Sequence, residues 1–136
     1  PRDLNVLRHE IVAMRQKMLD THPNDSDLFD IKHDRGGMVD IEFIVQFLIL
    51  AHAHTEPKLT ANSGNLALLM LAGKLELIKV ELAEAASNCY RTLRALQHKM
   101  RLNNQSPCRI DKKEIDTTSV ITLWEELLRS HCQEKK

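Results

Sequence analysis

The chain has 136 residues, of which 43% are hydrophobic and 28% are charged, and its 19 Lys and Arg residues balance 19 Asp and Glu residues. This length is enough for one domain with a substantial core, so neither disulfides nor a structural metal is required. A formal net charge of zero excludes an overall field that draws the chain to nucleic acid or to an anionic membrane, and neither is expected as a partner.

Apolar residues recur every three or four positions near the start of the chain and predict an amphipathic helix, with Asp3 as its N-cap. The expected apolar face consists of Leu4, Leu7, Ile11, Met14 and Met18. The charged residues expected on its other faces are Arg8, Glu10, Arg15 and Lys17. The proline and the short polar residues of segment 22–27 end this helix.

A short extended segment is predicted at residues 29–32, where Phe29 and Ile31 alternate with Asp30 and Lys32. Such a short strand is not stable by itself. Its partner is therefore expected outside this chain, and its unpaired edge would favour self-association.

The next helix, from Asp40 to about His54, is apolar nearly all round and is expected to be the buried centre of the bundle. A third helix begins at a cap formed by Asn62 or Ser63 and ends at Gly73. Its apolar residues are Leu66, Leu69, Met70 and Leu71.

Two more helices complete the predicted all-α fold, a bundle of about five helices in a single domain over residues 1–136. The fourth runs from about 79 to 102, with an apolar stripe formed by Leu82, Ala86, Cys89, Leu93, Leu96 and Met100. The last runs from about 117 to 132 with Asp116 as its cap. One face of the last helix carries Val120, Leu123, Trp124 and Leu127.

The cysteines Cys89, Cys108 and Cys132 lack C-x-x-C spacing, which indicates reduced thiols in a cytoplasmic protein. The longest apolar stretch, residues 43–53, is shorter than the roughly 20 residues of a membrane span. The chain begins with Pro1 rather than with methionine, which fits a piece of a longer protein.

A glycine pair, Gly36 and Gly37, lies directly before the most apolar helix and is the most specific local feature. Glycines allow backbone conformations and close approaches that other residues do not. Lys32 and Arg35 flank the pair, and backbone N–H groups at the start of the helix would be free to bind an anion. An ordinary tight turn is the alternative, because no known phosphate-loop spacing is present.

The acids after the glycines fall on different faces of the central helix. Asp40 is placed as a cap or first-turn acid, whereas Glu42 and Gln46 form a polar strip on roughly the opposite side. A buried charge needs a partner. That partner is either an arginine of a neighbouring helix, such as Arg91 or Arg94, or a nucleotide or the domain that binds one.

No catalytic residues and no metal site are predicted. His52 and His54 are two positions apart and point to different helix faces. Cys89 lies in an apolar stripe and is interpreted as a core residue rather than a nucleophile.

The run Phe29 to Lys32, the pair Gly36-Gly37, and the segment Asp40-Ile41-Glu42-Phe43-Ile44 with Gln46 resemble the signature of the glutamine synthetase adenylyltransferase family. The resemblance extends to the charged first helix and to residues 56–60 and 90–94, and it thins after about Met100. It therefore covers most of the chain.

This resemblance implies the C-terminal helical domain of a larger nucleotidyltransferase, in the half of the enzyme that adds AMP. That half transfers AMP from ATP to a tyrosine of glutamine synthetase, with magnesium, under control of glutamine and the PII signal protein. Glutamine synthetase, PII and the missing nucleotidyltransferase domain are the partners so implied. An equivalent run in the AMP-removing half typically reads Arg-Glu-Ile-Glu-Phe, unlike the segment at 40–43 here.

The family's catalytic Gly-Ser step with its following pair of aspartates is absent from this sequence, where Ser63-Gly64 is followed by Asn65. The chain alone is therefore expected to be inactive and to hold neither ATP nor magnesium tightly. The resemblance implies that six residues border the nucleotide or lock the helical domain onto the catalytic domain: Lys32, Gly36, Gly37, Asp40, Glu42 and Gln46. Alternatives are a module that binds PII or glutamine synthetase without nucleotide contact, and a stand-alone helical scaffold.

Overall fold

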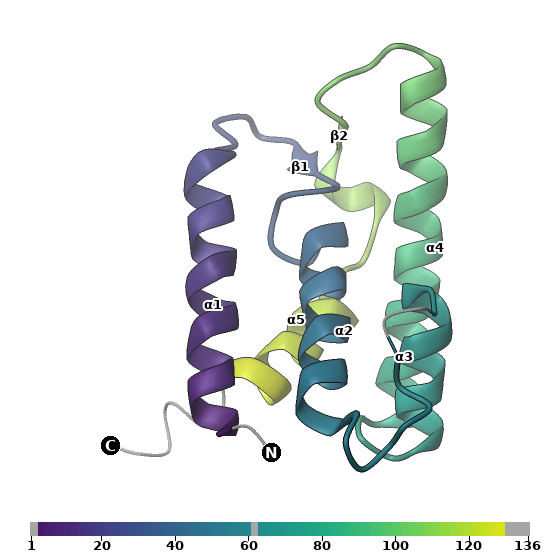
Figure 1. Ribbon diagram of the computed structural model, residues 1–136. Coiled ribbons are helices and arrows are strands. Elements are labelled where there is room, and N and C mark those ends of the chain that lie inside the picture. The colour runs from purple at the N-terminus through teal and green to yellow at the C-terminus, as the bar shows by residue number, and fades with distance from the viewer. Residues whose placement is uncertain (1–2, 61–62, 130–136) are drawn as a thin grey trace.

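Five α-helices and one two-stranded sheet make up the computed structural model, which describes residues 3–60 and 63–129 (Figure 1). The helices are α1 (Leu4–Thr21), α2 (Met38–His52), α3 (Asn65–Lys74), α4 (Val80–Leu102) and α5 (Thr118–Trp124). The strands are β1 (Phe29–Asp30) and β2 (Arg109–Ile110), and two short turns, η1 (Lys112–Glu114) and η2 (Glu125–Arg129), flank α5. The predicted all-α bundle of about five helices is confirmed. Two predicted positions, Asn62 and the helix end at Cys132, lie outside the described residues.

The first helix begins as predicted, because the Asp3 carboxylate accepts a hydrogen bond from the backbone N–H of Asn5 at 2.9 Å. Its buried face was predicted only in part. Leu7 and Ile11 are buried, but Met14 is 59% exposed and Arg15, expected on an outer face, is 0% exposed. The buried positions lie four apart, so α1 packs along a narrow row that ends in a charged residue.

The strand partner of residues 29–30 lies inside this chain, so the prediction of an external partner is wrong. Phe29 pairs with Ile110 in antiparallel register, and the N–H of Ile31 donates to the carbonyl oxygen of Cys108 at 3.1 Å. Phe29 is 8% exposed and Ile31 is 0% exposed, so this segment offers no open edge for self-association. A two-residue strand carries no periodicity by which its distant partner could be found.

Helix α2 is the central element, as predicted, and it contacts α1, α3, α4 and α5. Figure 1 shows it between α1 on one side and the α3–α4 pair on the other. Nine of its residues are buried: Met38, Val39, Asp40, Ile41, Ile44, Val45, Phe47, Leu48 and Ala51. One continuous apolar core joins all five helices.

The predicted ends of α3 are wrong. Gly64, not Ser63, is the N-cap residue, and it makes no side-chain cap bond. Gly73 lies inside the helix, where an added Cβ would be 2.8 Å from the Cβ of Ala83 in α4. This glycine serves close helix packing rather than termination, and the chain reverses instead at Glu76, whose φ is 62°.

Helix α4 matches its predicted bounds, and Ala86, Cys89, Leu93 and Met100 of its stripe are buried. Helix α5 begins within one residue of its prediction, but its N-cap residue is Thr117 rather than Asp116. The Asp116 carboxylate still accepts from the N–H of Thr118 at 2.9 Å. The described helices include none with the length and apolar composition that crossing a membrane requires.

Candidate functional site

A buried ion pair connects α1 to the start of α2. The Nε of Arg15 lies 2.5 Å from Oδ1 of Asp40, and the two side chains are 0% and 1% exposed. The second guanidinium nitrogen, Nη2, donates to the backbone carbonyls of His33 at 2.6 Å and Asp34 at 3.3 Å. Arg15 therefore binds the loop and the helix at once and holds residues 33–40 in one arrangement.

Asp40 is the first-turn acid that the helix wheel predicts. Its Oδ2 accepts a hydrogen bond from the N–H of Gly36 at 2.8 Å, while its Oδ1 binds Arg15. A carboxylate in the first turn also interacts favourably with the helix dipole. Both of its oxygens are thus engaged inside the protein.

Each glycine of the pair occupies a position that a larger residue cannot take. Gly36 has a φ of +86°, and an added Cβ would be 2.6 Å from Oγ1 of Thr117. At Gly37 an added Cβ would be 2.7 Å from the carbonyl oxygen of Ile31 and 2.9 Å from that of Asp34. The glycines let the loop pass tightly over its own backbone.

The backbone N–H groups at this turn are not free to bind an anion, and of the two interpretations the structure matches the ordinary tight turn. The N–H of Gly37 donates to the carbonyl of Asp34 at 2.9 Å. The next two, of Met38 and Val39, donate to the carbonyls of Ile31 at 2.9 Å and Lys32 at 3.0 Å. Together with the bond from Gly36 to Asp40, these contacts use four consecutive amides internally.

The other half of the predicted site faces outward. Lys32, Glu42 and Gln46 are all exposed, so the buried polar strip expected on α2 is not buried. Neither arginine that was considered as its partner pairs with it: Arg91 donates to Asn88, and Arg94 lies over the Tyr90 ring. Although Glu42 is at the surface, partial desolvation of its carboxyl by burial raises its pKa. The positive charge of Lys32 opposes that shift.

Glu42 and Gln46 line an apolar groove between α1 and α2 that has a volume of about 390 Å³. The apolar residues of the groove are Leu7, Ile11, Met14, Phe43 and Leu50. Glu10 stands at its edge. The structure thus divides the six predicted residues into a buried set (Gly36, Gly37 and Asp40) and an outward set (Lys32, Glu42 and Gln46).

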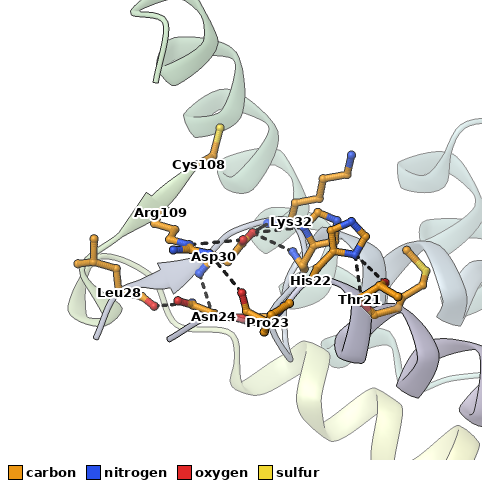
Figure 2. Close-up of polar contacts among 12 residues, drawn as sticks. Thr21, His22, Pro23, Asn24, Leu28, Asp30, Lys32, Cys108 and Arg109 are labelled. Carbon is orange, nitrogen blue, oxygen red and sulfur yellow. Dashed lines mark hydrogen bonds and ion pairs between the residues drawn. The ribbon is translucent and has the colours of Figure 1, made fainter. Parts of the chain in front are cut away.

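A polar network around Asp30 was not predicted from the sequence (Figure 2). Oδ1 of Asp30 accepts from the backbone N–H groups of Lys32 and His33, each at 3.0 Å, and its Oδ2 lies 3.7 Å from Nε of Arg109. The Asp34 carboxylate accepts from the N–H of Asp30 at 2.9 Å. The signal in the sequence was Asp30 itself, because an Asp side chain commonly accepts from the backbone N–H two residues further on.

Two histidine rings stack beside this network. The centroids of His22 and His33 are 3.9 Å apart and their planes differ by 6°. Burial, and then the charge of His22, lowers the pKa of His33, while Asp30 opposes this change.

Within residues 3–60 and 63–129, no group of three or more His, Cys, Asp or Glu side chains is placed to hold a metal ion. Cys89 is buried as predicted, and burial raises its pKa to about 11. Cys132 lies outside the described residues.

Comparisons with known proteins find the same family over most of the chain. The family model described as GlnD PII-uridylyltransferase matches residues 9–108. The bifunctional glutamine synthetase adenylyltransferase/adenylyl-removing enzyme of Bordetella bronchiseptica is 48% identical over 131 residues, which is 95% of this chain and 14% of that enzyme. The enzyme of the same name from Nitrosomonas europaea is 58% identical over 103 residues, 76% of this chain and 11% of that enzyme. The chain thus spans about one seventh of the length of these curated relatives or less.

Proposed function

The chain belongs to the family described as GlnD PII-uridylyltransferase, and because its relatives are named as bifunctional glutamine synthetase adenylyltransferases, we propose that it is a helical domain of such an enzyme. In this proposal the whole protein transfers AMP from ATP to a tyrosine of glutamine synthetase, as part of the control of nitrogen metabolism. The helical domain belongs to the half that adds AMP.

The observation that carries this proposal is the division of the motif into two sets. Arg15, Gly36 and Asp40 use their polar groups internally to shape the loop. Glu42 and Gln46 instead project into the apolar groove between α1 and α2, and no described element covers that groove. Since the relatives are about seven times longer than this chain, the rest of the same polypeptide is the natural occupant of the groove.

The apolar and acidic residues that line the groove indicate which surface can bind there. Its floor is apolar, and Met14 on its rim is 59% exposed. Glu42 adds a carboxylate whose pKa is raised by its surroundings, with burial as the largest cause. We therefore infer that the nucleotidyltransferase domain docks here through apolar side chains and at least one Lys or Arg.

The residues present do not fit a magnesium site, because Asp40 is bound to Arg15 and Gly36, and Asp30 is bound to two amides. Magnesium requires oxygen ligands that are free to bind it. We propose that ATP and magnesium bind in the nucleotidyltransferase domain and that this chain alone transfers no AMP. Robust magnesium-dependent AMP transfer to glutamine synthetase by the 136-residue chain would overturn this proposal.

The test of the docking role uses the full-length enzyme. Met14→Glu adds a negative charge beside those of Glu10 and Glu42, and Glu42→Gln removes one of these two charges. Each is expected to reduce AMP transfer by roughly tenfold, the effect of about 1.4 kcal/mol at an interface. The unfolding temperature should change little, because both side chains are exposed.

A matched control is Leu102→Glu, which places the same charge on an exposed leucine at the far end of α4. It should retain full AMP transfer. If Met14→Glu and Glu42→Gln also retain it, the groove is not a docking surface.

A second candidate is an interaction module that binds PII or glutamine synthetase without contact to nucleotide. The backbone N–H groups of Gly36 to Val39 all donate to acceptors inside the protein. This favours the second candidate, because the turn then has no free backbone donor for a phosphate. Separate titrations with ATP and with PII, followed by amide chemical shifts, distinguish the two. Shifts near Gly36 with ATP alone would favour the nucleotide contact.

A further inference from the structure

A separate hollow of about 200 Å³ lies between the loop after β1 and the end of α4. It shares none of the residues that line the apolar groove. The lining residues that matter here are Asp30, Lys32, His33, Gln97, Arg101 and Gln105.

The negative charge of this hollow is already compensated. Asp30 is 4% exposed, and its Oδ1 accepts two backbone N–H bonds at 3.0 Å. Its Oδ2 lies 3.7 Å from Nε of Arg109. Figure 2 shows the two side chains directed toward each other. Asp30 therefore contributes structure to the floor rather than a free anionic charge.

The positive charges of the hollow are not compensated in the same way. Among the residues that the structure describes, the side chains of Lys32 and Arg101 form neither a hydrogen bond nor an ion pair. Lys32 affects Glu42 only through its positive charge, which opposes the rise that burial causes in the pKa of that carboxyl. The pKa of His33 is lowered, first by burial, which disfavours a charge on its ring, so His33 is not counted among the cations of the hollow.

Both walls of the hollow are held in place by backbone contacts. The pairing of Asp30 with Arg109 and the bond from Ile31 N–H to the Cys108 carbonyl join them. On the far wall the N–H of Gln105 donates to the carbonyl of Met100 at 2.8 Å. The backbone of both walls is therefore formed before a ligand arrives, and only the exposed side chains of Lys32, Arg101 and Gln105 have to be ordered on binding.

We propose that this hollow binds the phosphate group of a small phosphomonoester. A phosphate carries up to two charges and three acceptor oxygens, which match two cations and the amide donors of Gln97 and Gln105. The volume equals that of about six to seven liquid waters at roughly 30 Å³ each, enough for a phosphate and part of the group that bears it. The inference does not depend on the proposed function.

The test follows amide chemical shifts of the 136-residue chain at constant ionic strength, which is maintained with chloride. Inorganic phosphate and ribose 5-phosphate are titrated separately. Saturable shifts are expected at Lys32, His33 and Gln105. Lys32→Gln and Arg101→Gln should each weaken binding by about tenfold or more, because each removes a charge-assisted hydrogen bond.

Lys99→Gln is the matched control, since Lys99 is an exposed cation on α4 that does not line the hollow. It should bind as the unmodified chain does. The proposal is overturned if phosphate gives no saturable shifts, or if Lys99→Gln weakens binding as much as the two lining variants. Tighter binding of ribose 5-phosphate than of inorganic phosphate identifies an ester as the ligand, and equal binding identifies the phosphate group alone; both support the site.

Discussion

At the scale of single residues, the ion pair of Arg15 and Asp40 ties two distant segments together with no access to solvent. Removing one partner of a buried pair leaves the other charge without compensation, which is far costlier than losing a surface pair. Arg15 also holds two loop carbonyls, so its loss would release the loop as well.

We therefore predict that Arg15→Met lowers the free energy of unfolding by about 3–5 kcal/mol, as measured by urea denaturation. Lys17→Met, two residues away on the exposed face of α1, should change it by less than about 0.5 kcal/mol. The double variant Arg15→Met with Asp40→Asn should lose less free energy of unfolding than the sum of its single variants, since it leaves no buried charge without a partner. Equal losses for Arg15→Met and Lys17→Met would contradict the buried pair.

The glycine pair supports a second prediction. Gly37→Ala should destabilise more than Gly36→Ala, because its Cβ meets two backbone oxygens that cannot move aside, whereas Gly36 meets the side chain of Thr117. Gly36→Ala still carries the strain of a φ of +86°. Gly64→Ala, with nothing within 4 Å of the new Cβ, is the control and should cost no more than about 1 kcal/mol in the same urea measurement, the penalty of alanine at the N-cap of α3. A Gly37→Ala variant as stable as Gly64→Ala would show that the loop is not this tight.

The sequence predicts some residue roles and misses others for a definite reason. Helix geometry alone separates Asp40 from Glu42, because their angular spacing is fixed by the helix. Arg15 was placed on an outer face because charged residues are seldom buried without a partner, and its partner lies 25 positions further along the chain. The outward position of Glu42 was missed because an apolar helix does not reveal which of its sides lacks a neighbour.

At the scale of elements, the β1–β2 pair joins two segments that are far apart in the sequence, since Phe29 pairs with Ile110. Helix periodicity predicted α2 and α4 well, whereas this pairing has no local pattern and was missed. The pair also positions the loop that carries the stacked rings of His22 and His33. The charged groups that act on His33 come from several elements: His22, Asp30, Lys32 and Arg15.

A pH dependence follows from this stack. The pKa of His33 is lowered in the folded chain, chiefly by burial, so the unfolded chain takes up that proton first as the pH falls through about 6.5. Stability should therefore decrease between pH 7.5 and 5.5, measured as the urea midpoint. His33→Gln should reduce this decrease, and His98→Gln, at an exposed position of α4, should leave it unchanged. An unchanged pH dependence in His33→Gln would contradict the role of the stack.

At the scale of the whole molecule, all five helices share one core, and α2 contacts each of the others. Unfolding any one of these five helices would expose core surface on the helices that it contacts. Trp124, the single tryptophan, is 2% exposed within this core and reports on it directly.

We predict that the 136-residue chain unfolds in one cooperative transition. Urea curves followed by Trp124 fluorescence and by helical circular dichroism should have the same midpoint, because α5 and the other helices lose their packing together. Separate midpoints would indicate that α5 is an independent unit. The single domain was predicted from chain length, and this measurement tests it.

The internal closure of the loop by Arg15 and Asp40 has a consequence for the kinetics of assembly. The conformational entropy of residues 33–40 is lost when this chain folds, and none of it is left to be lost when another surface arrives. A surface that contacts this loop therefore meets a formed backbone, and its rate of association depends on diffusion and charge rather than on a slow ordering of residues 33–40.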